Sequence, residues 1–145
     1  MASNPTTQPS TDAAAEPFDI LAFEDAEAAD LRIKHPITGA PTTMVVQLAG
    51  PEHPVRRRIV LARQRRMRAQ LAQTGELQVT DPEEDELDEL ELLVACTLGW
   101  RGAAQPYSPA AARDAFNDPR RRWLRDQVQR GLKDRQFFTR SCVPG

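Results

Sequence analysis

The chain is short of the residue types that most often build catalytic and metal sites. Its 145 residues include two histidines and two cysteines. Cys96 and Cys142 lie far apart, and neither belongs to a CxxC motif or to a Cys/His cluster with metal-ligand spacing. We therefore expect reduced, structural thiols and no bound metal or other cofactor.

The motifs of common enzyme classes are also missing. No GxxxxGK[ST] or GxGxxG loop occurs that could cradle a phosphate, and Ser108 precedes a proline instead of standing in a GxSxG turn. His35 and His53 flank turns, without a nearby serine, cysteine or aspartate that would complete a triad. The acidic run 83–91 suits a helix start better than a catalytic pair or a calcium loop. The sequence therefore predicts a protein that is not an enzyme.

Long apolar runs are absent as well. The longest mostly apolar run, Leu92 to Trp100, is about half of the ~20 residues that a bilayer core requires. The first residues lack the basic segment and apolar stretch of a secretory signal. We expect no membrane span, and a chain that stays in the cytoplasm of the cell that makes it.

The overall composition of the chain is that of one globular domain. Hydrophobic residues make up 40% and charged residues 28%, which is ordinary for such a domain. Residues 1–17 contain almost no large apolar side chains and are predicted to be a disordered polar arm. The prediction is a single domain over 18–139, followed by a loose tail over 140–145. At its start, we expect a short apolar group to pack on the core, in preference to anchoring a partner: Phe18, Ile20, Leu21 and Phe23.

Alternating apolar and polar residues predict a β-hairpin between Ala29 and Ala49. The segment Pro36 to Pro41 separates the two alternating stretches, and its prolines and glycine suit a chain reversal. A lone hairpin is only marginally stable in water, so it must pack on helices or pair with another chain. Self-association therefore remains open.

Four helices are predicted after the hairpin. The first spans Glu52 to about Gln73, with Thr74-Gly75 closing it. The second begins at an Asp81 cap and is expected to bury Leu87, Leu90, Val94 and Leu98, with Gly99 ending it. The third covers 108–117, and the fourth runs from 118 to near 138. The fold class is therefore α+β and mainly α: an N-terminal hairpin followed by about four helices.

Arginine is concentrated in the first of these helices. Seven arginines stand between Arg56 and Arg68, and the candidates for partner contact among them are Arg56, Arg63 and Arg66. Nine acids and no bases follow between Glu76 and Glu91, the net charge is −2, and no aromatics interleave the arginines to stack on bases. This pattern disfavours nucleic acid and favours a charge balance within the chain or a contact with another protein.

The large aromatic residues are the remaining candidates for partner contact. Core packing is favoured for them, and an interface is the alternative, because tryptophan among arginines is typical of interface hot spots. They are Trp100, Tyr107, Phe116, Trp123, Phe137 and Phe138.

The order of short motifs in the second half resembles tail assembly chaperones of long-tailed, siphovirus-like phages and prophages. The resemblance covers about residues 28–138 and includes the hairpin, but not the polar arm or the heavy use of arginine. Its motifs are an apolar helix ending in tryptophan (92–100), Tyr107-Ser108, Asp118-Pro119 with the Trp123-Leu124-Arg125-Asp126-Gln127-Val128 run, and Asp134-Arg135-Gln136-Phe137-Phe138.

The resemblance implies a non-enzymatic protein of the host cytoplasm. Such chaperones hold the tape-measure protein soluble, help recruit tail tube subunits and are commonly absent from the finished particle; some are also made in a longer, frameshifted form. Two other readings stay open. One is a permanent, ring-forming component of the virion neck or tail, and the less favoured one is a small nucleic-acid-binding protein that uses the arginine-rich helix.

Overall fold

The computed structural model describes residues 16–76 and 81–142. It divides into two compact units. Residues 25–139 form the main unit, and the described residues 16–24 and 140–142 form the terminal unit. Of the predicted domain 18–139, residues 18–24 belong to the terminal unit. Residues 1–15 of the predicted arm lie outside the described residues.

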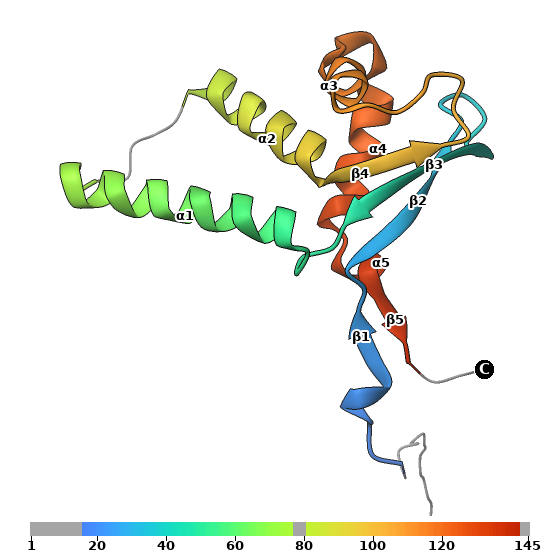
Figure 1. Ribbon diagram of the computed structural model, residues 1–145, viewed down its shortest axis with the longest axis horizontal. Helices are drawn as coiled ribbons and strands as arrows, with labels where there is room; N and C mark the ends of the chain where they lie inside the picture. Colours follow the sequence, from blue (N-terminus) through green and yellow to red (C-terminus); the bar gives the residue numbers. More distant parts are fainter. Residues whose placement is uncertain (1–15, 77–80, 143–145) are drawn as a thin grey trace, which may run out of the picture. The chain divides into compact units, whose positions relative to one another are not determined.

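A three-stranded antiparallel sheet organises the main unit (Figure 1). The predicted hairpin is confirmed as β2 (Ala28–Lys34) and β3 (Pro41–Ala49), with Leu31 opposite Val46. The turn between them uses Gly39 at a positive φ of 75°, a conformation that glycine adopts at little cost.

The third strand of this sheet was predicted as helix. β4 (Thr97–Arg101) pairs antiparallel with β3, so that Trp100 lies opposite Val46. The second helix ends at Cys96, where the Thr97 hydroxyl donates to the Leu93 carbonyl at 2.7 Å. A short apolar run can be helix or strand by its pattern alone, and here pairing with β3 decides.

Two helices, α1 (Pro54–Thr74) and α2 (Pro82–Cys96), lie between β3 and β4 in the chain. His53 caps α1 by accepting from the Val55 N–H at 3.1 Å, and Gly75 ends it in left-handed backbone, as predicted. Asp81 caps α2, with Pro82 in its first turn. Local signals thus define both helices.

The predicted fourth helix is divided. α3 (Pro109–Asn117) begins at a Ser108 cap as expected, and a 3₁₀ turn, η3 (Pro119–Arg121), follows it. α4 (Arg122–Lys133) then ends at Asp134, whose carboxylate caps the short α5 (Arg135–Phe138). This cap starts a new helix where the sequence pattern indicated a continuous one.

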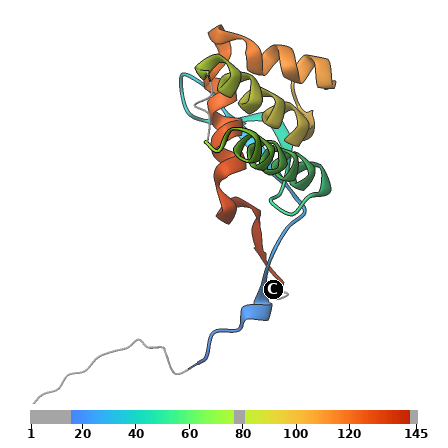
Figure 2. The ribbon, with the colours of Figure 1, turned by 90° about the vertical axis from the view of Figure 1, so that its left-hand side faces the viewer.

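The core lies where the sheet meets α2, α3 and α4. α2 lies between α1 and α3 in both views (Figures 1 and 2). The buried side chains come from all of these elements except α1: Ile33, Val46, Leu48, Ala49, Leu90, Leu93, Cys96, Ala112, Phe116, Leu124, Val128, Leu132 and Phe138. The hairpin and the helices that follow it therefore share one core around β3.

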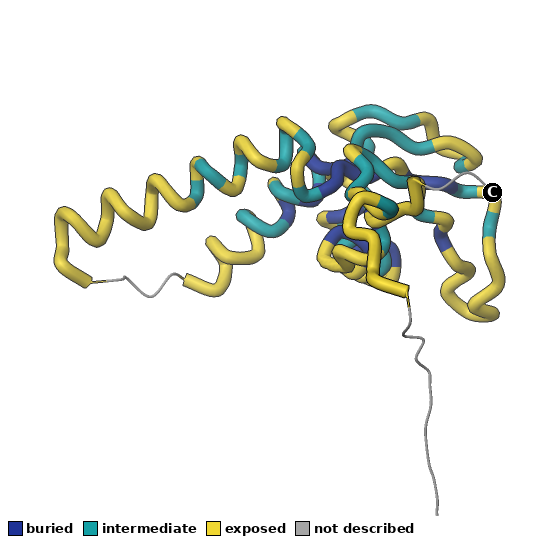
Figure 3. The backbone as a smooth tube through the Cα atoms, turned by 90° about the horizontal axis from the view of Figure 1, so that it is seen from below, coloured by how far each residue is buried: buried dark blue, intermediate teal, exposed yellow. Residues whose placement is uncertain are grey.

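The outer parts of α1 and α2 contribute nothing to this core. No residue of α1 is buried, and residues 64–76 and 81–87 are all exposed (Figure 3). Leu87, predicted to face inward, is 57% exposed, whereas Leu93 is buried at 1%. We call these outer parts, residues 57–76 and 81–87, the helical arm.

The terminal unit is small and leaves its apolar side chains exposed. It contains the 3₁₀ turn η2 (Ile20–Ala22) and most of the paired strands β1 (Phe23–Asp25) and β5 (Thr139–Ser141). The predicted core packing of its apolar group is wrong, because Phe18 is 74%, Ile20 76% and Leu21 81% exposed. Residues 140 and 141 of the predicted loose tail are in β5, and 143–145 lie outside the described residues.

Candidate partner-binding groove

A hollow of about 490 Å³ lies between the edge strand β2 and the helices α4 and α5. β2 is an edge strand because it pairs with β3 alone in the three-stranded sheet. Apolar side chains from three elements line the hollow, and they are Leu31, Pro36, Trp123 and Phe137. We call this hollow the β2–α4 groove.

Gln127 of α4 holds the groove together at the edge of the sheet. Its side-chain amide donates to the Lys34 carbonyl at 2.9 Å and accepts from the Lys34 N–H at 2.9 Å. An edge strand otherwise leaves such backbone groups without a protein partner. The paired bonds therefore fix β2 against α4 and occupy this point of the edge.

Gly131 sets the depth of the groove floor. A Cβ atom at this position would lie 3.2 Å from Leu31 Cδ2 and 3.4 Å from Leu48 Cδ1. α4 therefore approaches the sheet closely here. The Leu31 side chain forms part of the floor directly beside the helix backbone.

Trp123 is the most accessible large side chain of the groove. It is 38% exposed, so the favoured reading of Trp123 as a core residue is not what the structure shows. Phe137 is half-buried and packs edge-on against Phe138, with ring centroids 5.0 Å apart. Tryptophan beside other apolar groups, partly open to solvent, is the composition of interface hot spots.

Charges of both signs surround these apolar side chains. Lys34 and Arg130 stand at the rim with Asp126 and Asp134. Within the described residues, Lys34, Arg130 and Asp126 form no ion pair. The groove thus offers an apolar floor and unpaired rim charges, as expected of a surface that binds a protein segment with its own charged flanks.

Two aromatic candidates brace the loop after β4 instead of facing a partner. Trp100 and Tyr107 meet edge to face at 5.1 Å, and Trp100 Nε1 donates to the Gln105 carbonyl at 2.8 Å. The Tyr107 hydroxyl donates to the Thr97 carbonyl at 3.0 Å, and burial raises the pKa of this phenol. Phe116 and Phe138, each 1% exposed, are core residues.

Two of the three arginine candidates have structural roles. Arg56 donates to the Ala49 carbonyl at 3.1 Å and to the Leu132 carbonyl at 2.7 Å, and its guanidinium lies 5.6 Å from the Phe138 ring centroid. Desolvation by burial lowers the pKa of Arg56. Arg63 donates to the Asp88 carbonyl. Both cations therefore serve as backbone donors that join α1 to its neighbours.

Arg66 remains exposed and without an ion pair in the described part of the chain. Among the described residues, the expected charge balance between the arginine-rich and acidic helices does not extend to Glu86 and Glu91, which pair with other elements. The acids of α2 pair elsewhere: Glu91 with Arg113 at 2.6 Å and Glu86 with Arg122 at 3.5 Å.

Arg125 is buried although its position in a basic stretch suggested a solvated side chain. It is 6% exposed, and its Nη2 donates to the Glu86 carbonyl at 3.3 Å. Its Nε has no partner within the described residues. Arg125 therefore joins α4 to α2 from inside the main unit.

Both histidines and the buried Cys96 have local, structural roles. His35 Nδ1 accepts from the Ile37 N–H at 3.1 Å within the hairpin turn, much as His53 caps α1. Burial raises the pKa of the Cys96 thiol to about 11, which leaves it protonated at neutral pH. Over residues 16–76 and 81–142, no group of three or more His, Cys, Asp or Glu residues is placed to hold a metal ion.

Of the residues that line the groove, the sequence singles out Trp123 and Phe137 as candidates but not the residues that shape it. Gln127 lies in no recognisable sequence pattern. Gly131 gives a weak signal, because glycine inside a helix is unfavourable unless packing requires it.

No helix in the described part of the chain combines the length and hydrophobicity needed to cross a bilayer.

The comparisons with known proteins add no relative to this description. No protein-family model, curated protein or solved structure matches the chain. Function must therefore be inferred from the β2–α4 groove and from the resemblance of the sequence.

Proposed function

We propose that this chain is a non-enzymatic tail assembly chaperone of a long-tailed phage or prophage. It would act in the host cytoplasm by binding the tape-measure protein and helping to recruit tail tube subunits. The β2–α4 groove, with the half-open Trp123 over an apolar floor, is the observation that supports a binding role. The phage assignment rests on the resemblance.

A helix of the tape-measure protein is the ligand that suits this groove. Such a helix exposes an apolar stripe until the tail tube encloses it, and amphipathic helices bind by laying that stripe into an apolar groove. Trp123, Leu31 and Phe137 would contact the stripe. The rim charges, Lys34 and Arg130 with Asp126, would pair with charged residues beside the apolar stripe. Because these pairs would lie at the solvent-exposed rim, the complex could still dissociate.

Co-expression with the tape-measure protein of the same genome tests the proposal. We expect the partner to be soluble with the wild-type chain and to precipitate without it. Trp123→Ala should weaken binding roughly 30-fold, because loss of a central aromatic residue of an interface costs about 2 kcal/mol. Binding is measured by co-purification and by titration with a tape-measure fragment.

Met67→Ala is the matched control, since it also removes an exposed apolar side chain, but from α1. It should bind as the wild type does, and circular dichroism should show both variants folded. A tape-measure protein that is equally soluble alone, or undiminished binding by Trp123→Ala, would contradict the proposal. Stoichiometric presence of the chain in purified particles would favour the virion-component reading instead.

A further inference from the structure

The helical arm leaves both of its helices exposed in the part of the chain that the structure describes. Residues 64–76 and 81–87 are exposed on every side, including the apolar Met67, Leu71 and Leu87 (Figure 3). Helices of this length gain most of their stability from packing of a face against another element. The arm therefore has surface available for another chain.

The side of α1 that faces away from α2 carries a positively charged hollow. Its volume is about 380 Å³, and Leu61 lies in it among Arg57, Arg58 and Arg65. Within the described residues, Arg58 and Arg65 form no ion pair, whereas Arg57 pairs at 2.9 Å with Glu52, which also lines the hollow. α1 itself contains no acidic residue. We call this feature the arginine hollow.

The first turns of α2 carry the opposite chemistry. Leu87 is 57% exposed, and the carboxylates three and four positions from it, Glu84, Glu83 and Glu91, share its side of the helix. Glu83 and Glu84 form no ion pair in the described residues. We call this feature the acidic leucine tip.

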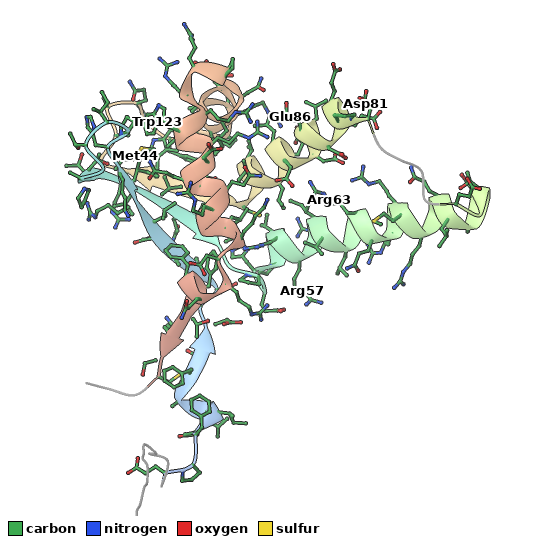
Figure 4. The ribbon with its side chains drawn as sticks, turned by 180° about the vertical axis from the view of Figure 1, so that it is seen from behind. Met44, Arg57, Arg63, Asp81, Glu86 and Trp123 are labelled. Carbon is green, nitrogen blue, oxygen red and sulfur yellow. The ribbon has the colours of Figure 1, made fainter. Side chains whose placement is uncertain are left out.

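The arginine hollow cannot receive the tip of its own chain. Arg63, which reaches the Asp88 carbonyl of α2, points from one side of α1, and Arg57 points from the other (Figure 4). Because the hollow opens on the side of Arg57, α2 of the same chain lies behind it. Only a second molecule can bring an acidic tip to the hollow.

We propose that this protein self-associates head to tail, with the acidic leucine tip of one copy seated in the arginine hollow of the next. Leu87 packs on Leu61, and Glu83 and Glu84 pair with Arg58 and Arg65 of the neighbouring copy. The two surfaces differ, so the contact is heterologous and continues into a ring or a short stack. A nucleic acid would use the arginines but would leave Leu61 uncovered and meet repulsion from the nearby acids of α2.

Charge reversal on each surface, followed by mixing, tests this contact. We expect the wild type to show a mass by light scattering that rises with concentration at low salt and falls as salt screens the pairs. Arg58→Glu/Arg65→Glu should weaken self-association roughly tenfold or more, and so should Glu83→Arg/Glu84→Arg. Mixing the two variants should restore it, because each reversed surface then meets an opposite charge.

Lys133→Glu, which reverses an exposed charge on α4 outside the β2–α4 groove, is the control and should self-associate as the wild type does. A wild type that stays monomeric up to roughly millimolar concentration would overturn the proposal. So would failure of the mixed variants to associate while both remain folded by circular dichroism. Duplex DNA provides the last test. If a monomeric wild type binds DNA at low salt and Arg58→Glu/Arg65→Glu does not, the arginine hollow is a site for polyanions and the proposal is wrong.

Discussion

Gly102 is the residue whose replacement the backbone tolerates least. It follows β4 with φ of 77°, and a Cβ atom there would lie 1.9 Å from the Thr43 carbonyl oxygen. Left-handed backbone alone costs a non-glycine residue about 1 kcal/mol, and the clash adds to that. We expect Gly102→Ala to lower the free energy of unfolding by about 3 kcal/mol or more, measured by urea denaturation.

Gly39 serves to separate the cost of left-handed backbone from the cost of the clash with Thr43. Its φ of 75° is almost the same, but a Cβ atom there meets nothing within 4 Å. Gly39→Ala should therefore cost only about 1 kcal/mol. If both variants lose the same free energy of unfolding, the close approach of Gly102 to Thr43 does not contribute to the cost.

Arginine residues also differ by what surrounds them. Arg56 and Arg63 donate to backbone carbonyls, Arg125 is buried, and Arg58 and Arg65 stand around an open hollow. The sequence could place all of them on helices. Which ones reach a carbonyl depends on elements far away in the chain, such as α4 for Arg56.

At the scale of one element, α2 presents different leucines to the core and to solvent. Leu93→Ala should lower the free energy of unfolding by about 2–5 kcal/mol, because it leaves a cavity in a packed core. Leu87→Ala should change it by less than about 0.5 kcal/mol. Dilute samples keep self-association from contributing to this comparison.

Thermal or urea unfolding of the two variants measures the difference. The sequence pattern predicts Leu87 and Leu90 on one inner stripe, whereas the structure buries Leu90 and leaves Leu87 exposed. A large loss of stability in dilute Leu87→Ala would contradict the exposed position of this side chain.

At the scale of the main unit, stability should be distributed unevenly. The amides of residues 64–74 belong to a helix without a buried residue, whereas β3 has four buried residues in its second half: Val45, Val46, Leu48 and Ala49. Hydrogen exchange by mass spectrometry should therefore show much faster exchange in the outer half of α1 than in β3.

The same experiment at high concentration bears on self-association. If copies stack through the helical arm, exchange over residues 57–68 and 83–91 should slow down, while exchange in β3 should not change. Uniform protection of α1 and β3 in dilute protein would contradict the uneven distribution.

Local sequence signals predict both ends of α1, the starts of α2 and α3 and the hairpin of β2 and β3, but not β1, β4, β5 or the break between α4 and α5. Caps such as Asp81 and Ser108, the closing Gly75 and the alternation of β2 and β3 act within a few residues, so they can be read locally. Contacts between distant elements explain why Thr97–Arg101 is a strand, why Leu87 and Trp123 are exposed, and why Gln127 binds Lys34. These outcomes depend on β3 and α4, which lie far away in the chain, and local patterns carry no information about such contacts.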